Sequence, residues 1–388
     1  MACWELAAAA NRTPGWQGIL VTGTPSSPND QGFNRICIPE MAPDNPIKRD
    51  IFEAFRRGVK HPAIEAVAED LKSQLDAILQ PTDLLISFNC FSLPYNLPLT
   101  VALWKITQER HDFAHVTWSW DIAAVEEEYP WTLRFDWPWS LFWNTCPRVI
   151  YAASTGPVAN LQAQILGIEP SMIRVINGGV DPSRCLRLSS RIAGICRSRN
   201  LFGAFPLLYM PAKISSRKDI PRAIDVLAEL RSQYRNAHLV IAGSLSPHDV
   251  STSQKAHSLR ETISAFGLSD AVTILGSEPS FNGKTDFLDS MSMMALSDGL
   301  LFTSRREGFL FPILEAGLHS IPIFAPALDA VVSWAGDYSI MYPPSSSPRE
   351  ISRVVGEAFK DPASKRKFLF RTEYTWDRVF ARYFSDIR

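Results

Sequence analysis

Short apolar runs alternate with longer amphipathic stretches along the chain, and they fall into two series. The first series has expected strands at residues 18–23, 83–89, 115–121 and 173–181. Helices are expected over residues 3–10, 51–79 and 97–110, and again after the apolar run 148–154, where Ser154 offers a side-chain cap.

The second series begins after an arginine-rich stretch at residues 184–199. Its apolar runs are residues 205–212, 238–243, 271–276, 299–304 and 321–326, with amphipathic stretches between them. Short apolar strands that alternate with helices are typical of parallel βαβ units. The pattern therefore predicts an α/β protein with two doubly wound parallel-sheet domains, in which ligands bind at the carboxyl ends of the strands.

The composition argues against nucleic-acid binding and against a membrane-spanning protein. The chain has 388 residues, 46% of them hydrophobic and 20% charged, with a formal net charge of -1, so no basic field suggests nucleic acid as a partner. Its six cysteines are scattered, as expected in a reducing cytosol. No apolar run approaches the ~20 residues of a membrane span, and the first residues do not resemble a signal peptide. A cytoplasmic protein is expected, with peripheral membrane contact left open.

The stretch RREGFLFPILEAG, residues 305–317, follows an expected strand and opens an expected helix. Pro312 is placed at the first helical position, where its missing N–H costs nothing. The backbone N–H groups of Gly308, Phe309 and Leu310 would then lie at a helix N-terminus, which attracts phosphate. An anion site is therefore predicted at this turn.

Two glutamates bracket that turn: Glu307 lies just before the helix and Glu315 in its expected first turn. A carboxylate repels a diphosphate and only accepts hydrogen bonds, so its partners here would be hydroxyls of a ribose or a hexose. Phosphate on the amides and hydroxyls on the glutamates suit a sugar nucleotide. The alternative is an ordinary helix that buries the apolar residues between the two glutamates.

Two further stretches carry candidate chemistry. Lys213 and Lys218 lie in MPAKISSRKD, between a strand and a helix, and two cations there would neutralise a diphosphate. The alternative is a solvated basic loop. In VINGGVD, Gly178 and Gly179 would allow a tight turn with positive φ, and Asp181 would begin the next segment; a plain turn is the alternative.

Taken in chain order, VINGGVD, then the lysine stretch, then RREGFLFPILEAG, the three stretches resemble glycosyltransferase family 4, retaining enzymes of GT-B fold. The resemblance also includes AIDVLAELRSQYRNAHLVIAG and the C-terminal YTWDRVFARYF, and it is strongest over residues 173–325. It implies two Rossmann-like domains that face a central cleft. Residues 1–183 would form the acceptor-side domain and residues 184–365 the donor-binding domain, and the helix of residues 366–388 would pack back on the first domain.

The resemblance also implies roles for individual residues. Lys213, where the family usually has arginine, and Lys218 would hold the donor diphosphate, and Glu315 would bind the ribose. Glu307 would hold the donor sugar and phosphate together with the amides of Gly308, Phe309 and Leu310. Gly276 would lie near the base. No Asp-x-Asp motif is present, and the resemblance implies neither a metal nor a cofactor.

Three departures from the family pattern are evident. The strand and glycine-rich loop with which members open are absent before residue 3, so the expectation is a chain that lacks its first strand. Phe88 and Trp120 stand where a subgroup has histidines, which leaves Asp121 as the candidate polar group opposite the donor. Asp121 is equally an N-cap for the segment that follows it. Finally, Leu310 replaces a glycine of the family.

The function implied by the resemblance is transfer of a hexose, with retention of configuration, from a nucleoside diphosphate sugar to an acceptor hydroxyl. Asp121, Lys213, Lys218 and Glu307 are the candidate catalytic residues. The acceptor is open among a sugar, a small molecule and a lipid-linked compound. One alternative is a non-catalytic protein of the same fold that binds a nucleotide sugar or a protein partner. Another is an epimerase-type enzyme of this architecture, which would need a histidine in the cleft.

Overall fold

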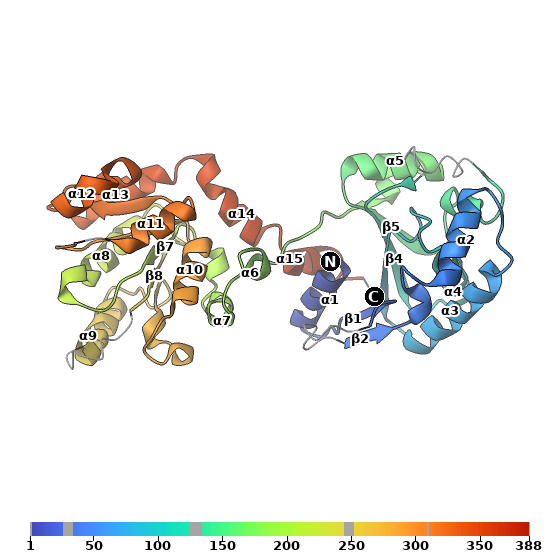
Figure 1. Cartoon of the computed structure of the whole chain (residues 1–388), viewed down its shortest axis with the longest axis horizontal. Coiled ribbons are helices and arrows are strands. Elements are labelled where there is room, and N and C mark those ends of the chain that lie inside the picture. Colours follow the sequence, from blue (N-terminus) through green and yellow to red (C-terminus); the bar gives the residue numbers. More distant parts are fainter. Residues whose placement is uncertain (1, 26–33, 124–133, 244–251, 309, 388) are drawn as a thin grey trace. The chain divides into compact units, whose positions relative to one another are not determined.

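The computed structural model describes residues 2–25, 34–123, 134–243, 252–308 and 310–387. The chain divides into two compact units. Unit 1 comprises Met1–Gly179 together with Tyr374–Arg388, and unit 2 comprises Val180–Glu373. Both units combine parallel strands with packed helices (Figure 1), which confirms the predicted α/β class with two Rossmann-like parallel-sheet domains, as a GT-B fold requires.

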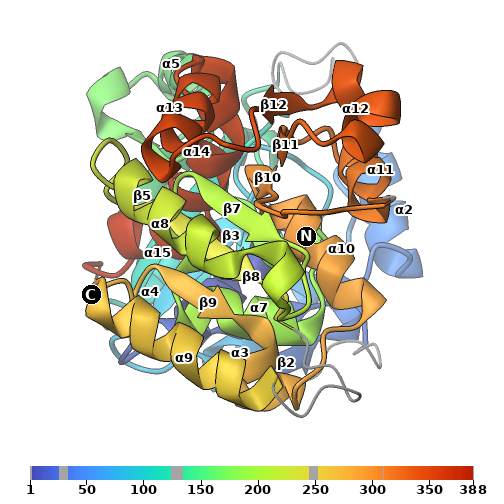
Figure 2. The same ribbon diagram turned by 90° about the vertical axis from the view of Figure 1, so that its left-hand side faces the viewer.

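Unit 2 is built on one six-stranded sheet in the order β12-β11-β10-β7-β8-β9, which Figure 2 shows across the unit. All neighbouring strands pair in parallel. The strands are β7 Leu207–Met210, β8 His238–Ile241, β9 Val272–Ile274, β10 Gly299–Leu301, β11 Ile323–Pro326 and β12 Ile340–Tyr342. The chain reverses its direction of travel across the sheet between β7 and β10, which is the position where doubly wound sheets bind ligands.

Helices cover both faces of this sheet. They are α6 Pro182–Cys185, α7 Ser190–Ser198, α8 Ile220–Leu230, α9 Thr252–Ala265, α10 Phe287–Leu296, α11 Phe311–Leu318, α12 Asp329–Ala335, α13 Pro348–Ala358 and α14 Arg366–Thr372. Side chains of β7 alternate between the faces. Leu208 and Met210 pack with α8, α9 and α13, whereas Leu207 and Tyr209 pack with α7, α10, α11 and α12. The continuous apolar runs of the sequence are strands buried on both sides.

Unit 1 contains two parallel sheets instead of one. A four-stranded sheet has the order β3-β4-β5-β6, and β1 pairs separately with β2. The strands are β1 Ile19–Thr22, β2 Asn34–Cys37, β3 Leu84–Phe88, β4 Ala114–Ser119, β5 Val149–Ala153 and β6 Arg174–Val175. Among the residues that the structure describes, no strand joins β1 to β3, so each of these two strands has only one paired neighbour.

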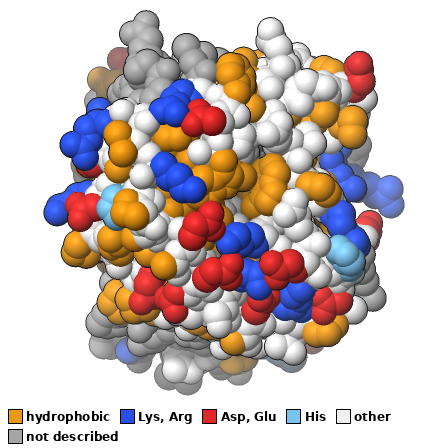
Figure 3. Space-filling model, turned by 90° about the vertical axis from the view of Figure 1, so that its right-hand side faces the viewer, with side chains coloured by type: hydrophobic (Ala, Val, Ile, Leu, Met, Phe, Trp, Pro, Cys, Tyr) orange, Lys and Arg blue, Asp and Glu red, His pale blue; other side chains and the backbone are white. Residues whose placement is uncertain are grey.

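The helices of unit 1 pack on both sides of its larger sheet. They are α1 Ala2–Arg12, α2 Pro46–Arg56, α3 Ile64–Ile78, α4 Leu97–Glu109, α5 Gly156–Leu166 and α15 Trp376–Tyr383. Ala152 of β5 packs with α1 and α15, whereas Tyr151 and Ala153 pack with α3, α4 and α5. On the face of unit 1 that Figure 3 shows, charges of both signs lie among hydrophobic side chains.

Two local expectations need correction. Residues 51–79 form α2 and α3 instead of one helix, because Gly58 takes a left-handed φ of 70° and the turn that follows contains Pro62. The cap of α5 is Thr155, whose Oγ1 accepts a hydrogen bond from the backbone N–H of Val158 at 3.4 Å. Ser154 instead extends the strand pairing, since its N–H donates to the carbonyl of Ser119.

The turn at NGGVD also differs from its expected geometry. Neither Gly178 nor Gly179 has a positive φ. Gly179 is instead a point of close approach, because a Cβ there would lie 2.6 Å from the backbone nitrogen of Trp376. Asp181 caps α6, accepting a hydrogen bond from the N–H of Ser183 at 2.8 Å.

The chain enters unit 2 after Gly179 and leaves it after Glu373, so α14 belongs to unit 2. The expected boundary after residue 365 assigned α14 to the C-terminal segment, but the chain leaves unit 2 only after Glu373. The reason is Arg371 of α14, which donates to both carboxylate oxygens of Asp298 at 2.8 Å and lies 97% buried in unit 2. No helix within the described residues is long and apolar enough to cross a membrane.

Candidate functional site

Lys218 and Glu307 meet at the carboxyl edge of the sheet in unit 2. Lys218 ends a short 3-10 helix after β7, and Glu307 follows β10, the sheet neighbour of β7. Lys218 Nζ and Glu307 Oε1 form an ion pair of 2.5 Å, in which only 12% and 4% of the two side chains are exposed. Residues far apart in sequence are thus joined because adjacent parallel strands end at one edge.

Hydrogen bonds tie the two loops behind this pair. Thr303 Oγ1 donates to the backbone carbonyl of Lys218 at 3.1 Å and to that of Asp219 at 2.9 Å. Arg305 donates from its backbone N–H to the carbonyl of Arg217 at 2.9 Å, and from Nε to Asp219 Oδ2 at 2.8 Å. Thr303, Arg305 and Asp219 carry no local sequence signal for this role. Only the pairing of β7 with β10, which local pattern does not reveal, brings them together.

Helix α11 presents its N-terminus at the same loop. It begins at Phe311, so Pro312 is its second residue and not, as expected, its first. Its N-cap residue Leu310 makes no side-chain capping bond, so the first-turn N–H groups are not satisfied by a cap. Gly308 is exposed, and a Cβ there would meet no atom within 4 Å. Phe309 lies outside the described residues.

Leu310 differs from the exposed Gly308 in that its side chain is buried. Its side chain is 3% exposed and packs in the core with Ile313 and Ala316. The side chain that replaces the family's glycine is therefore accommodated inside the unit. Only the backbone of Leu310 is left to meet a ligand.

Glu315 lies in the second turn of α11, since the helix starts at Phe311; the expectation of the first turn is wrong. Its side chain makes no hydrogen bond or ion pair with the rest of the described chain. Burial raises the pKa of Tyr209, and the charges of Asp289 and Glu315 add to that effect, so the Glu315 carboxylate acts electrostatically on the Tyr209 hydroxyl of β7. The half-buried carboxylate is thus an acceptor with no partner among the described residues.

Lys213 lies on the β7–α8 connection that also carries Lys218, and Gly276 lies on the loop after β9. Lys213 is exposed and makes no ion pair with any part of the chain that the structure describes. Gly276 is buried just after β9, and its N–H donates to the carbonyl of Ala242 at 3.0 Å. The N–H of Gly276 is therefore already occupied, and what this residue offers a ligand is close approach of the backbone.

Asp121 lies in unit 1, two residues beyond β4, and is exposed. Asn89 Oδ1 accepts from the backbone N–H of Trp120 at 2.7 Å, and the N–H of Asp121 approaches it at 3.5 Å. Phe88, Trp118 and Trp120 form a ring cluster with centroid separations of 5.3 to 6.4 Å. Asp121 was expected to cap the segment of residues 122–129, and residues 124–129 of it lie outside the described residues.

The structure thus gathers Lys218, Glu307, Glu315 and the start of α11 in unit 2, and it holds Asp121 in unit 1. No group of three or more His, Cys, Asp and Glu side chains placed to hold a metal occurs within the described ranges. The site in unit 2 combines three positively charged groups: Lys218, which is paired with Glu307, the exposed Lys213, and the N-terminus of α11. Such a combination can receive a phosphate group.

A known protein family matches the part of the chain that contains this site. Residues 197–371 match the family model of glycosyl transferases, group 1, over a segment just under half of the chain. The segment lies within unit 2 and contains Lys213, Lys218 and both glutamates. The match supports a place in the group 1 glycosyltransferase superfamily and a sugar-transferring role for this unit. No curated protein matches the chain.

Several solved structures are similar to the chain at low identity. The N-terminal domain of Candida albicans trehalose-6-phosphate phosphatase is 10% identical, with coverage of 100% of this chain and 92% of that one and a TM-score of 0.38. Anabaena HepE in complex with UDP-glucose is 14% identical, with coverage of 98% and 93% and a TM-score of 0.38. Sucrose-phosphate synthase of Thermosynechococcus elongatus is 16% identical, with coverage of 98% and 89% and a TM-score of 0.36. At such TM-scores these likenesses carry no argument about function.

Proposed function

We propose that the chain is a retaining glycosyltransferase of family 4 that moves a hexose from a nucleoside diphosphate sugar to an acceptor hydroxyl. The observation that carries the proposal is the Lys218–Glu307 pair, held at the uncapped start of α11 inside the segment that matches the group 1 family. Unit 2 would bind the donor and unit 1 the acceptor. The protein would act in the cytoplasm.

The departing nucleoside diphosphate is the species that this site would stabilise. Its negative charge grows as the bond to the sugar breaks, and fixed cations and helix N–H groups aimed at it lower the barrier. Lys213 and Lys218 would supply the cations and the N-terminus of α11 the amides, so no metal is needed. Glu307 currently neutralises Lys218, and donor binding would redirect that ammonium toward phosphate.

The glutamates would bind hydroxyl groups. Glu315, which has no described hydrogen-bond partner, would accept from the ribose, and Glu307 would accept from the donor sugar. Gly276 would let the base approach the end of β9. Asp121 of unit 1 would orient the acceptor hydroxyl and take up its proton.

The first test is a binding measurement by calorimetry with UDP, GDP, ADP and their sugar conjugates. One of the three nucleotides should bind, and Glu315→Ala should weaken its binding roughly tenfold to hundredfold, because a charged hydrogen bond is worth about 1.5–3 kcal/mol. Glu357→Ala, which removes an exposed carboxylate of α13, is the control and should leave binding unchanged. A flat response to all nucleotides, or an unchanged dissociation constant in Glu315→Ala, would overturn the donor site.

A binding protein without catalysis is the second candidate, and one observation favours it. Phe88 and Trp120 pack into an aromatic cluster at the strand ends of unit 1, and neither side chain can titrate. One experiment distinguishes the enzyme from the binding protein. The protein is incubated with the donor that it binds and with a panel of sugar and lipid-linked acceptors, and NMR of the anomeric proton identifies any product. A product with retained configuration supports the enzyme. Nucleotide binding with neither sugar transfer nor hydrolysis of the donor supports the binding protein.

A further inference from the structure

Asp219, the residue after Lys218, has a backbone conformation that is unfavourable for a residue with a Cβ. Its φ of 48° and ψ of 51° lie in the left-handed region. The residue ends the short 3-10 helix that carries Lys218 and begins α8, and its side chain makes no capping bond there. Such a conformation persists only where the surrounding structure imposes it. The turn after Lys218 is therefore held by contacts from another part of the unit.

The contacts that hold this turn come from the loop after β10, the strand that Figure 2 shows beside β7. Thr303 Oγ1 donates to two carbonyls, that of Lys218 at 3.1 Å and that of Asp219 at 2.9 Å. Arg305 Nε donates to Asp219 Oδ2 at 2.8 Å. The peptide groups on both sides of Asp219, and its carboxylate, are thus bonded to one neighbouring loop.

The two contacting side chains differ in burial. Thr303 is fully buried, so water cannot replace its bonds to the two carbonyls, and its hydroxyl cannot meet a ligand. The Arg305 side chain is 70% exposed, and solvent weakens its ion pair with Asp219. Thr303 therefore provides the main constraint on the turn. Lys218 is the residue just before this turn, so the position of its ammonium beside Glu307 depends on it.

We propose that Thr303 is a positioning residue for the donor diphosphate. By fixing the turn at Asp219, it holds the Lys218 ammonium beside Glu307 and just before α11, where phosphate would bind. An ammonium that is already in place loses little freedom when phosphate arrives, so it binds phosphate more tightly than a mobile one. The inference rests on the proposed function and extends it to a buried residue that acts only through Lys218.

The first test compares ligands with and without phosphate by NMR titration of the full chain, which also detects weak binding. The probes are UDP, GDP, ADP and the nucleosides uridine, guanosine and adenosine. Thr303→Val keeps the size of the side chain and removes the hydroxyl. It should weaken binding of the nucleotide about tenfold, as expected for one charged hydrogen bond, and leave binding of the nucleoside unchanged. Thr303→Ser, which restores the hydroxyl, should recover most of the loss.

Two further variants separate this role from general damage to unit 2. Lys218→Met removes the cation through which Thr303 acts, so adding Thr303→Val to it should cause no further loss of affinity. Thr372→Val is the matched control in α14. Thr372 Oγ1 also donates to two carbonyls, those of Phe368 at 2.8 Å and Leu369 at 3.4 Å, but it lies outside the two loops of the site. This change should leave binding of every probe unaltered.

A measurement without ligand tests the positioning itself. NMR of the lysine ammonium groups reports how rigidly each one is held, and the signal of Lys218 is identified by its loss in Lys218→Met. The ammonium should be rigid in the wild-type protein and in Thr303→Ser, and mobile in Thr303→Val. Where Thr303→Val alone fails to fold, the double variant with Asp219→Gly replaces it, because glycine takes the left-handed turn without strain.

The outcomes are distinct. A rigid Lys218 ammonium in Thr303→Val, equal losses for nucleotide and nucleoside, or a loss that persists in the Lys218→Met background would overturn the inference. A mobile ammonium with unchanged nucleotide affinity would overturn it as well. If no nucleotide binds the wild-type protein but Thr303→Val frees the ammonium, the positioning of Lys218 stands and the proposed function fails. If nucleotide binds and Thr303→Val changes neither affinity nor mobility, the proposed function stands and this inference fails.

Discussion

The two units follow the same alternation of strand and helix, yet only unit 2 closes it into one sheet. Its central strand β7 pairs with both β10 and β8 and is buried at every residue. In unit 1, β1 pairs only with β2 and β3 only with β4, and Ile19 of β1 is 45% exposed. Alternating elements therefore predict a layered fold but do not settle whether neighbouring strands pair.

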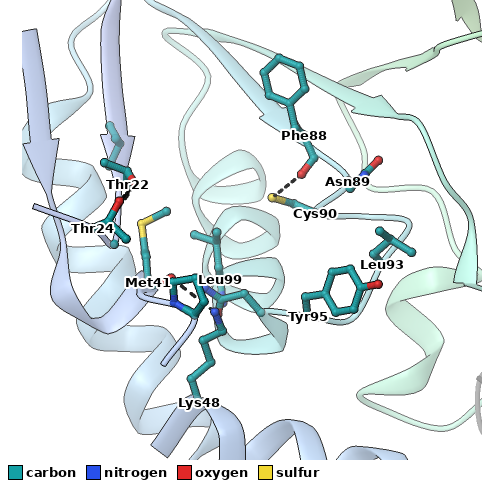
Figure 4. Close-up of a pocket in the computed structure, with 14 residues that line it drawn as sticks. Thr22, Thr24, Met41, Lys48, Phe88, Asn89, Cys90, Leu93, Tyr95 and Leu99 are labelled. Atoms are coloured by element: carbon teal, nitrogen blue, oxygen red, sulfur yellow. Dashed lines mark hydrogen bonds between the residues drawn. The ribbon is translucent and has the colours of Figure 1, made fainter. Parts of the chain in front are cut away.

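The difference in pairing changes the kind of site that each unit builds. In unit 2 the order of strands reverses between β7 and β10, which are hydrogen-bonded, so their loops touch and Lys218 reaches Glu307 directly. In unit 1 the reversal falls between β1 and β3, which do not pair. Described residues at the ends of both strands, together with Lys48 of α2, line a pocket there instead (Figure 4). At the same topological position, an ion pair joins the loops in unit 2, whereas the loops line a pocket in unit 1.

The largest effect that we expect on stability comes from the anchor of α14 in unit 2. Arg371→Met would leave Asp298 buried without its partner, and should lower the free energy of unfolding of unit 2 by about 3–5 kcal/mol. The matched change in unit 1 is Arg12→Met, which removes an exposed pair between α1 and Asp377 of α15 and should cost at most about 1 kcal/mol. Urea unfolding followed by hydrogen exchange in each unit measures both. Equal losses would show that burial does not distinguish the two anchors.

Acid should affect both units through one buried histidine in each. Burial lowers the pKa of His115 to about 3 and that of His238 to about 4, so both are neutral when folded near pH 5. An unfolded histidine takes up a proton below about pH 6.5, so stability falls as pH drops from there to the folded pKa, by about 1.4 kcal/mol per pH unit for each histidine. The loss should continue about one pH unit further in unit 1 than in unit 2.

Glutamine variants isolate this effect from that of the carboxylates. His115→Gln should flatten the pH dependence of unit 1 between pH 6.5 and 4.5, and His238→Gln should do the same for unit 2. His257→Gln, at an exposed position, should leave both curves unchanged. Stability of each unit measured against pH gives the answer, and an unchanged slope in His115→Gln would contradict a neutral buried imidazole.

The sequence was most informative where burial is complete. The strands of unit 2 were predicted because apolar runs such as residues 205–212 and 299–304 are flanked by polar turns. The polar strand β2 and the short β12 were missed, since NRIC and IMY carry no distinctive pattern and pair because of the neighbours beside them. Strand pairing is a tertiary property, which local patterns of this kind do not reveal.

For the candidate site, residue types were predictable and partners were not. Lysines and glutamates at strand ends indicated a charged site, but the Lys218–Glu307 pair and the ties through Thr303 depend on β7 lying beside β10. Lys48 gave no local signal, because its burial results from the way α2 packs against the loop at Met41. A glycine at position 179 was expected because of a positive φ, whereas the structure shows that a side chain there would collide with the backbone of Trp376.

The smallest predicted effect compares one helix cap in each unit. Thr155 caps α5 of unit 1, and Ser347 caps α13 of unit 2 in a capping box with Glu350. Thr155→Ala should lower the stability of unit 1 alone by about 1 kcal/mol, and Ser347→Ala should lower that of unit 2 alone by a similar amount. Ser154→Ala is the matched control, because Ser154 contributes its backbone and not its side chain, and it should have little effect. A larger loss in Ser154→Ala than in Thr155→Ala would restore the cap expected from the sequence, and a loss shared by both units would show that they do not unfold separately.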